Sequence, residues 1–243
     1  MKPFYVMEVL ERAQELERAG EDVVHLEVGE PDFDTPEPIK EACLRALREG
    51  KTHYTHSLGI LELREAICEH YWEKYGVEVT PDQVVITSGT SPGMLLLFSV
   101  LLDRGDEVIL PDPYYPCYPN FVQYVGGVPK ALPTEEAEGF RYEPQRVRGA
   151  IGPRTKAIVV NSPSNPTGVV MEPERLREIA SLPLWVVSDE IYHGLVYEGR
   201  EHTMLEFTDR CFVLNGFSKL YAMTGWRLGY VIAPREFVRP MQI

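Results

Sequence analysis

The chain has 243 residues, of which 44% are hydrophobic and 25% charged, a composition typical of a globular protein with a sizeable core. Its formal net charge of -13 argues against nucleic acid or an anionic membrane surface as the main partner, but allows a local cationic pocket. The cysteines are widely spread without a CxxC pair, so neither a zinc site nor a disulfide framework is expected. No apolar signal core or membrane-length window occurs, which predicts a cytoplasmic protein.

The first fifty residues are expected to form two helices joined by a strand and a turn. Residues 4–19 carry apolar side chains at helical spacing, which predicts an amphipathic helix with a packing face. Residues 23–28 alternate like a strand, and residues 29–33 break it. A second helix is expected over residues 36–48, with Thr35 as its N-cap and a proline at its first position.

The rest of the chain alternates between helical patterns and short apolar runs. A helix is expected over residues 60–75, and a capping box begins at Thr80. Further helices are expected at residues 92–102 and 172–180, and strands at residues 84–87, 107–110, 128–132, 156–161, 184–188 and 211–214, with another apolar run near residue 227. This rhythm predicts an α/β fold with a mostly parallel sheet flanked by helices.

Three polar residues each follow one of the buried strands. They are Asn165, Asp189 and Lys219. Because parallel sheets bind ligands at the carboxyl ends of their strands, we expect all three on one rim of the sheet. A carboxylate there is costly unless a cation pairs with it, although an ordinary N-cap aspartate remains an alternative for Asp189.

Lys219 and Arg227 together suggest one ligand with a carbonyl and a phosphate. Lys219 lies between apolar neighbours, and partial burial should lower its pKa and favour the neutral amine that attacks a carbonyl. Arg227 adds a planar cation suited to a phosphate. The turn 88–91, between a strand and a helix N-terminus, has the features of an anion cradle, though an ordinary N-cap looks the same. Pyridoxal phosphate carries both groups.

Residues 218–219 and 223–230 (MTGWRLGY) resemble the Schiff-base signature of the class I/II aminotransferases, which are fold-type I pyridoxal phosphate enzymes. Further motifs follow the family's order at residues 28–33, 54–64, 88–91, 162–168 and 188–192. The resemblance implies a three-layer α/β/α large domain over residues 51–243, incomplete at its C-terminal end. Residues 1–50 would form an N-terminal arm and a segment of the small domain.

The resemblance also implies roles for individual residues. Lys219 would hold the cofactor as a Schiff base and then act as general base, while Asp189 would keep the ring nitrogen protonated. Tyr192 and Asn165 would hydrogen-bond the phenolic oxygen, and Gly29 and Asn165 would lie near the substrate carboxylate. The remaining cofactor contacts would come from Gly89, Thr90, Ser91, Tyr115, Ser218, Arg227 and Tyr54. Tyr115 would stack on the ring, although a tyrosine cluster is more often packing.

Tyr54 would reach the phosphate of a neighbouring subunit, which implies a homodimer with shared sites. No metal is expected, since His53 and His56 lack a third ligand at suitable spacing. Gly216 stands where the family often has a phosphate-binding serine or threonine, and Gly93 where it usually has alanine. The chain also ends before the family's C-terminal small domain, so it is expected to be truncated.

The expected activity is transfer of an amino group between an L-amino acid and a 2-oxo acid. Two alternatives remain: a lyase or synthase relative that uses the same cofactor chemistry for C–S bonds, or a non-catalytic fragment that binds pyridoxal phosphate. The sequence does not specify the amino donor or acceptor.

Overall fold

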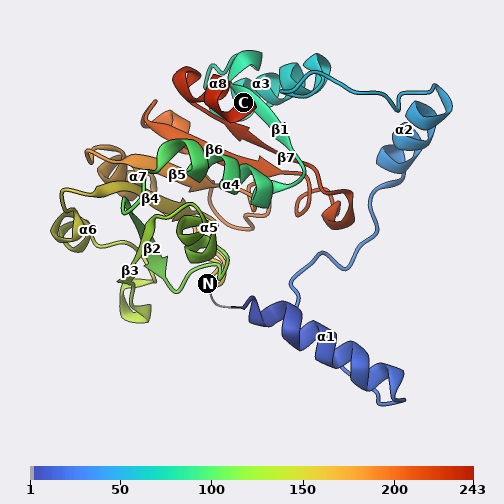
Figure 1. Cartoon of the computed structure of the whole chain (residues 1–243), viewed down its shortest axis with the longest axis horizontal. Coiled ribbons are helices and arrows are strands. Elements are labelled where there is room, and N and C mark those ends of the chain that lie inside the picture. The colour runs from blue at the N-terminus through green and yellow to red at the C-terminus, as the bar shows by residue number, and fades with distance from the viewer. Residues whose placement is uncertain (1–2) are drawn as a thin grey trace.

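A computed structural model describes residues 3–243 of the chain. Seven apolar runs form strands: β1 (Val84–Thr87), β2 (Glu107–Asp112), β3 (Val128–Pro133), β4 (Thr155–Asn161), β5 (Trp185–Asp189), β6 (Cys211–Gly216) and β7 (Gly229–Ile232). They form one sheet in the order β1-β7-β6-β5-β4-β2-β3 (Figure 1). Strands β2, β3, β4, β5 and β6 are parallel to one another, whereas β7 runs antiparallel to both β6 and β1. The mostly parallel sheet is therefore confirmed.

Helices cover both faces of this sheet. The α-helices are α1 (Tyr5–Arg18), α2 (Glu37–Arg48), α3 (Leu61–Tyr75), α4 (Thr90–Leu101), α5 (Tyr118–Tyr124), α6 (Pro144–Ala150), α7 (Pro173–Ala180) and α8 (Arg235–Gln242). Short 3-10 turns are η1 (Pro81–Gln83), η2 (Glu136–Glu138), η3 (Met204–Glu206) and η4 (Thr224–Trp226). Helices α5, α6 and α8 were not predicted from the sequence. In residues 3–243 no helix is both long and apolar enough to cross a membrane.

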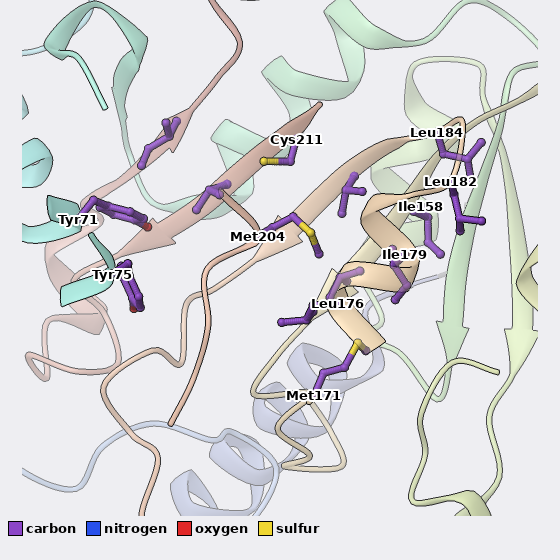
Figure 2. Packing of buried hydrophobic residues seen from close by; sticks show 14 of the residues in the cluster. Tyr71, Tyr75, Ile158, Met171, Leu176, Ile179, Leu182, Leu184, Met204 and Cys211 are labelled. Carbon is purple, nitrogen blue, oxygen red and sulfur yellow. The ribbon is translucent and has the colours of Figure 1, made fainter. Parts of the chain in front are cut away.

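Two hydrophobic clusters hold the three layers together. One face of the sheet packs against α3, α6 and α7, and Figure 2 shows part of this cluster, with Leu176 and Ile179 of α7 near Ile158 of β4. The other face packs against α4, α5 and α8 through residues such as Leu97 and Val122. Because alternate residues of a strand point to opposite faces, the buried strands are apolar on both sides.

The N-terminal segment differs from its prediction in two respects. Residues 23–28 form no strand, and Val24 and Leu26 are 80% and 90% exposed, because no neighbouring strand pairs with them among the described residues. In α1 only Ala13 is buried, so most of its predicted packing face is not covered by the described residues. Figure 1 shows α1 and α2 lying away from the sheet.

The sequence predicted Thr35 as the N-cap of α2, and this prediction is wrong. Pro36 occupies that position. The hydroxyl of Thr35 instead donates to the carbonyl of Ala222 at 2.6 Å and accepts from Trp226 Nε1 at 2.9 Å. Thr35 therefore fastens the N-terminal segment to the loop that follows Lys219.

The carboxyl ends of three neighbouring parallel strands meet at one edge of the sheet. Asn161, at the end of β4, pairs in register with Asp189 at the end of β5, and Asp189 pairs with Leu214 of β6. The connection from β5 to β6 contains only the 3-10 turn η3. The loops after these three strands carry the predicted site residues.

Candidate active site

A cavity of about 1470 Å³ opens at the carboxyl ends of β4, β5 and β6. It is lined by most of the residues that the sequence singled out: Gly29, Thr90, Ser91, Tyr115, Asn165, Asp189, Tyr192, Ser218, Lys219 and Arg227. The fold therefore brings together residues from six separate segments of the chain, as expected for a sheet with a ligand site at its strand ends.

Lys219 is partly buried at the cavity wall, just beyond β6. Its Nζ donates a 2.6 Å hydrogen bond to the carbonyl of Gly29 and lies 5.9 Å from the centre of the Tyr192 ring. Burial lowers the pKa of Lys219, and the nearby Arg227 cation lowers it further, whereas Glu30 opposes the shift. The neutral, nucleophilic amine is thus favoured more than in an exposed lysine.

Asp189 is a buried carboxylate at the end of β5. It accepts a 2.6 Å hydrogen bond from Tyr118 and one of 3.3 Å from the backbone N–H of Ile191. Burial raises the pKa of Asp189, and these two hydrogen bonds oppose that shift. Across residues 3–243, no basic side chain contributes to this balance. An ionised Asp189 would consequently be stabilised by a cationic ligand in the cavity.

Two hydrogen-bond donors stand together on the same wall. Asn165 Nδ2 lies 3.2 Å from the hydroxyl of Tyr192 and donates to it. Their two loops are joined by Asn161, whose Oδ1 accepts from the backbone N–H of Asn165 at 2.6 Å and whose Nδ2 donates to the carbonyl of Asp189 at 2.9 Å. Asn161 thus fixes the Asn165 loop against the Asp189 turn.

The turn between β1 and α4 lies against the guanidinium of Arg227. Gly89 has φ +93°, and a Cβ at this position would overlap the Arg227 side chain. Arg227 Nη1 donates to the carbonyl of Thr224 at 2.8 Å, which orients the guanidinium. Thr90 and Ser91 begin α4, so their N–H groups and the positive end of the helix dipole accompany this cation. The arrangement suits an oxyanion such as a phosphate.

Tyr115 borders the cavity as expected but is packed by other aromatic rings. It makes edge contacts with Phe4 at 5.9 Å and Tyr118 at 5.5 Å between ring centroids. Burial is the main reason that the pKa of its hydroxyl is raised. The aromatic wall is therefore held by the N-terminal arm on one side and α5 on the other.

Two predicted site residues, Tyr54 and Gly89, do not line the cavity. Tyr54 is fully exposed, whereas Gly89 lies against the Arg227 side chain. At Gly216 there is little room for the side chain that the family often carries, because an added Cβ would lie 3.0 Å from the carbonyl of Leu228. Gly93 is similarly enclosed, with Val231 at 2.8 Å from an added Cβ. Both departures from the family pattern match the local packing.

Sequence reasoning did not identify Asn161 or the bond from Tyr118 to Asp189. The signal for Asn161 was its position at the end of a buried β-branched strand, where an amide needs partners. No local pattern indicates the Tyr118 contact, because its two residues are 71 positions apart. Within residues 3–243, no group of three or more His, Cys, Asp or Glu side chains could hold a metal ion, and the four cysteines are free.

Comparison with known proteins places this site in a known context. Residues 21–243 match the family model described as aminotransferase class I and II. The chain is 47% identical over 240 residues to the (5-formylfuran-3-yl)methyl phosphate transaminase of Methanocaldococcus jannaschii, covering 97% of this chain and 62% of that protein. It is also 47% identical to the aspartate/prephenate aminotransferase of Thermus thermophilus, covering 99% of this chain and 64% of that protein.

A solved structure shows the same arrangement. The aspartate aminotransferase of Thermus thermophilus with maleate superposes with a TM-score of 0.97 at 46% identity, covering all of this chain and 65% of that one. The chain thus spans just under two thirds of the length of these relatives. The agreement extends through the N-terminal arm, since no part of the chain is left uncovered. On the family model, the sequence identity and the fold together, the chain belongs to the aminotransferase class I and II family.

Proposed function

We propose that this chain forms the cofactor-binding part of a pyridoxal phosphate-dependent aminotransferase, which transfers an amino group between an L-amino acid and a 2-oxo acid. The single observation that carries the proposal is that Lys219 and Asp189 line the same cavity. One is an amine with a lowered pKa, and the other is a buried carboxylate that no basic side chain of residues 3–243 neutralises. A ligand with an aldehyde and a protonatable ring nitrogen satisfies both.

The residues around the cavity fit pyridoxal phosphate group by group. Lys219 would bind the aldehyde carbon covalently, and Asp189 would bind the ring nitrogen. Asn165 and Tyr192 would donate to the phenolic oxygen, with Tyr115 beside the ring. The turn at Thr90 and Ser91, together with Ser218 and Arg227, would bind the phosphate. When bound, the cofactor supplies an electron sink that stabilises negative charge at the substrate Cα.

The chain's own residues account for the proton movements that such a transfer needs. The amine of Lys219, whose pKa is lowered, would take up the proton of the substrate Cα and return it during the transfer. Asp189, oriented by Tyr118, would hold a proton on the ring nitrogen by its negative charge. Arg227 would hold the phosphate and so fix the ring against displacement.

Three further assignments belong to the same proposal. The protein would act as a homodimer in which Tyr54 binds the phosphate of the partner's site, since its ring is fully exposed here. Residues 1–50 would form the arm and small-domain segment, with residues 51–243 as the cofactor-binding domain. Gly29, whose carbonyl lies beside Lys219, would face the substrate carboxylate.

Trapping of the cofactor tests the proposal. Purified protein is mixed with pyridoxal 5'-phosphate and reduced with borohydride, and the modified peptide is located by mass spectrometry. The label should appear on Lys219 and disappear in Lys219→Ala. An exposed lysine provides the control, since Lys156→Ala should leave the labelling unchanged. Labelling spread over surface lysines, with Lys219 unmodified, would defeat the proposal.

Assays of 2-oxo acid formation with and without an amino acceptor then identify the reaction. A requirement for the acceptor supports amino transfer. Continued formation of the 2-oxo acid without any acceptor, beyond one equivalent per active site and with release of ammonia, would instead identify a lyase.

A further inference from the structure

Behind the cavity wall lies a second layer of polar side chains that the proposed chemistry does not use. Asp189 and Tyr192 face the cavity, whereas Glu190 and His193, which alternate with them, are 1% and 3% exposed and lie on the other side of the turn. Glu190 and His193 are ionisable and are not cavity residues. Burying such groups is costly unless hydrogen bonds repay it, so their contacts need an explanation.

Glu190 gathers hydrogen bonds from three parts of the chain. Its Oε1 accepts from Ser188 of β5 at 2.9 Å, from the hydroxyl of Thr203 at 3.0 Å and from the backbone N–H of Met204 at 3.0 Å. Its Oε2 lies 3.5 Å from the hydroxyl of Tyr71 on α3. The carboxylate thus connects the turn after β5 to η3 and to α3.

His193 connects the same turn to the loop of Asn165. Its Nδ1 lies 2.7 Å from the hydroxyl of Tyr75, and its Nε2 lies 3.0 Å from the carbonyl of Ser162, where that loop begins. Because a carbonyl only accepts, Nε2 carries the proton and Nδ1 accepts from Tyr75. Tyr71 and Tyr75 stand side by side on α3 (Figure 2). His193 and Glu190 approach each other at 3.5 Å.

We infer that Glu190 is a positioning residue, which with His193 holds the Asp189–Tyr192 turn and the Asn165 loop at a fixed separation from behind. The inference rests on the proposed function, since it assigns these loops to cofactor binding. A side chain set in its geometry by buried hydrogen bonds binds a ligand without first becoming ordered. In metal sites, residues that support the ligands from behind typically change affinity by roughly 10- to 100-fold when removed, and we expect an effect of this order here.

The variants separate positioning from bulk stability. Glu190→Ala leaves three buried donors without an acceptor, whereas Glu190→Gln keeps an oxygen where all three converge. Tyr142→Phe is the matched control, because Tyr142 is equally buried and donates to Val159 of β4, outside both loops. Thr203→Val removes one donor and keeps the volume, and it replaces Glu190→Ala in the comparison should that variant fail to fold.

The first readout is the affinity for pyridoxal 5'-phosphate, titrated by absorbance. Glu190→Ala should weaken binding by roughly 10-fold or more, Thr203→Val by less in the same direction, and Glu190→Gln by no more than about threefold. Tyr142→Phe should lower the unfolding temperature and leave the affinity unchanged. Equal affinity in Glu190→Ala and in the unaltered protein, or equal losses in Glu190→Ala and Glu190→Gln, would overturn the inference.

The second readout does not depend on the cofactor. Amide hydrogen exchange in the cofactor-free protein should become faster in residues 162–168 and 189–194 of Glu190→Ala or Thr203→Val, but not in Tyr142→Phe. Unchanged exchange in both segments would overturn the inference even if no cofactor binds. An unaltered protein that fails to bind pyridoxal phosphate would defeat the proposed function alone, so the two failures are distinguishable.

Discussion

The Nζ of Lys219 donates to the carbonyl oxygen of Gly29, a residue 190 positions earlier, at 2.6 Å. This hydrogen bond fixes the N-terminal segment against the nucleophile of the proposed site. It also brings the neighbouring Glu30 close enough to Lys219 to raise its pKa, against the lowering by burial and by Arg227. The reactivity of Lys219 therefore depends on a carboxylate that lies outside the loop carrying the lysine.

Replacing Glu30 tests this dependence. Glu30→Gln keeps an oxygen that can accept from Thr224 but removes the negative charge, so the pKa of Lys219 should fall. A larger fraction of neutral amine at a given pH should then increase its rate of reaction with an amine-directed reagent. The measurement is labelling of Lys219 against pH, followed by mass spectrometry. Glu174→Gln, at an exposed site on α7, is the control, and an equal rate profile in both variants would contradict the prediction.

Gly89 allows a second test, which concerns the proposed phosphate cradle. In Gly89→Ala the new methyl group overlaps the Arg227 guanidinium, and a side chain at φ 93° and ψ 173° strains the backbone by about 1–3 kcal/mol. Displacing a charged hydrogen-bond donor should weaken pyridoxal phosphate binding by roughly 10-fold, since such bonds contribute about 1.5–3 kcal/mol. Binding of pyridoxal, which lacks the phosphate, should change little. Titration of both ligands separates the two effects.

Gly126 provides the matched control for Gly89. It has φ +89°, and an added Cβ would make only an ordinary contact with Arg104 at 3.5 Å. Gly126→Ala should therefore place a side chain at a similar positive φ without disturbing Arg227. If Gly126→Ala weakened pyridoxal phosphate binding as much as Gly89→Ala, strain rather than loss of the cradle would be the cause.

Much of the cavity could be predicted because its residues follow buried strands directly. The strand before each of Asn165, Asp189 and Lys219 is apolar enough to be located from sequence, and parallel strands deliver their carboxyl ends to one edge. The position of the site therefore depends on local patterns and one topological rule, and both can be read from the residues.

The arm could not be predicted in the same way. The alternation in residues 23–28 indicates a strand, but a strand exists only where another pairs with it, and none does in the described chain. Threonine is a common N-cap residue, yet the Thr35 hydroxyl forms hydrogen bonds with Ala222 and Trp226, which are distant in sequence. Such tertiary contacts override local propensity and leave no local signal.

The hydrogen bond from Tyr118 to Asp189 is a second tertiary contact of this kind. Removing the Tyr118 hydroxyl should destabilise the fold in a pH-dependent way. Tyr118→Phe removes the strongest group that opposes the raised pKa of Asp189. Because folding raises the pKa of Asp189, the free energy of unfolding falls as pH rises from the unfolded pKa of 3.8 to the folded pKa. In the variant the folded pKa should lie higher still, so the free energy of unfolding should fall over a wider pH range. The destabilisation should be about 1.5–3 kcal/mol near neutral pH and smaller in acid.

Urea unfolding of Tyr118→Phe and Tyr142→Phe across this pH range checks the prediction. Tyr142 donates to a neutral carbonyl, so its replacement should cost about 1 kcal/mol at every pH. A pH-independent loss in Tyr118→Phe would show that Asp189 does not depend on this hydroxyl for its charge.

The titrations of Glu190 and His193 should cancel in the pH dependence of unfolding. Burial raises the pKa of Glu190 to about 7 from 4.5 and lowers that of His193 to about 4 from 6.5. Between pH 4.5 and 6.5 the unfolded pair holds one proton on the histidine, and the folded pair holds one on the glutamate. Because the proton count is equal, the pair gives no pH dependence of unfolding in this window.

Single replacements should expose two slopes of opposite sign. In His193→Gln only the folded state keeps a proton between pH 4.5 and 6.5, so the free energy of unfolding should fall by about 1.4 kcal/mol per pH unit as pH rises. In Glu190→Gln only the unfolded state binds the proton, and the free energy should rise by a similar amount. Urea unfolding of both variants measures the slopes relative to the unaltered protein, so that other groups cancel. Parallel curves for all three proteins would mean that this buried pair keeps its ordinary pKa values.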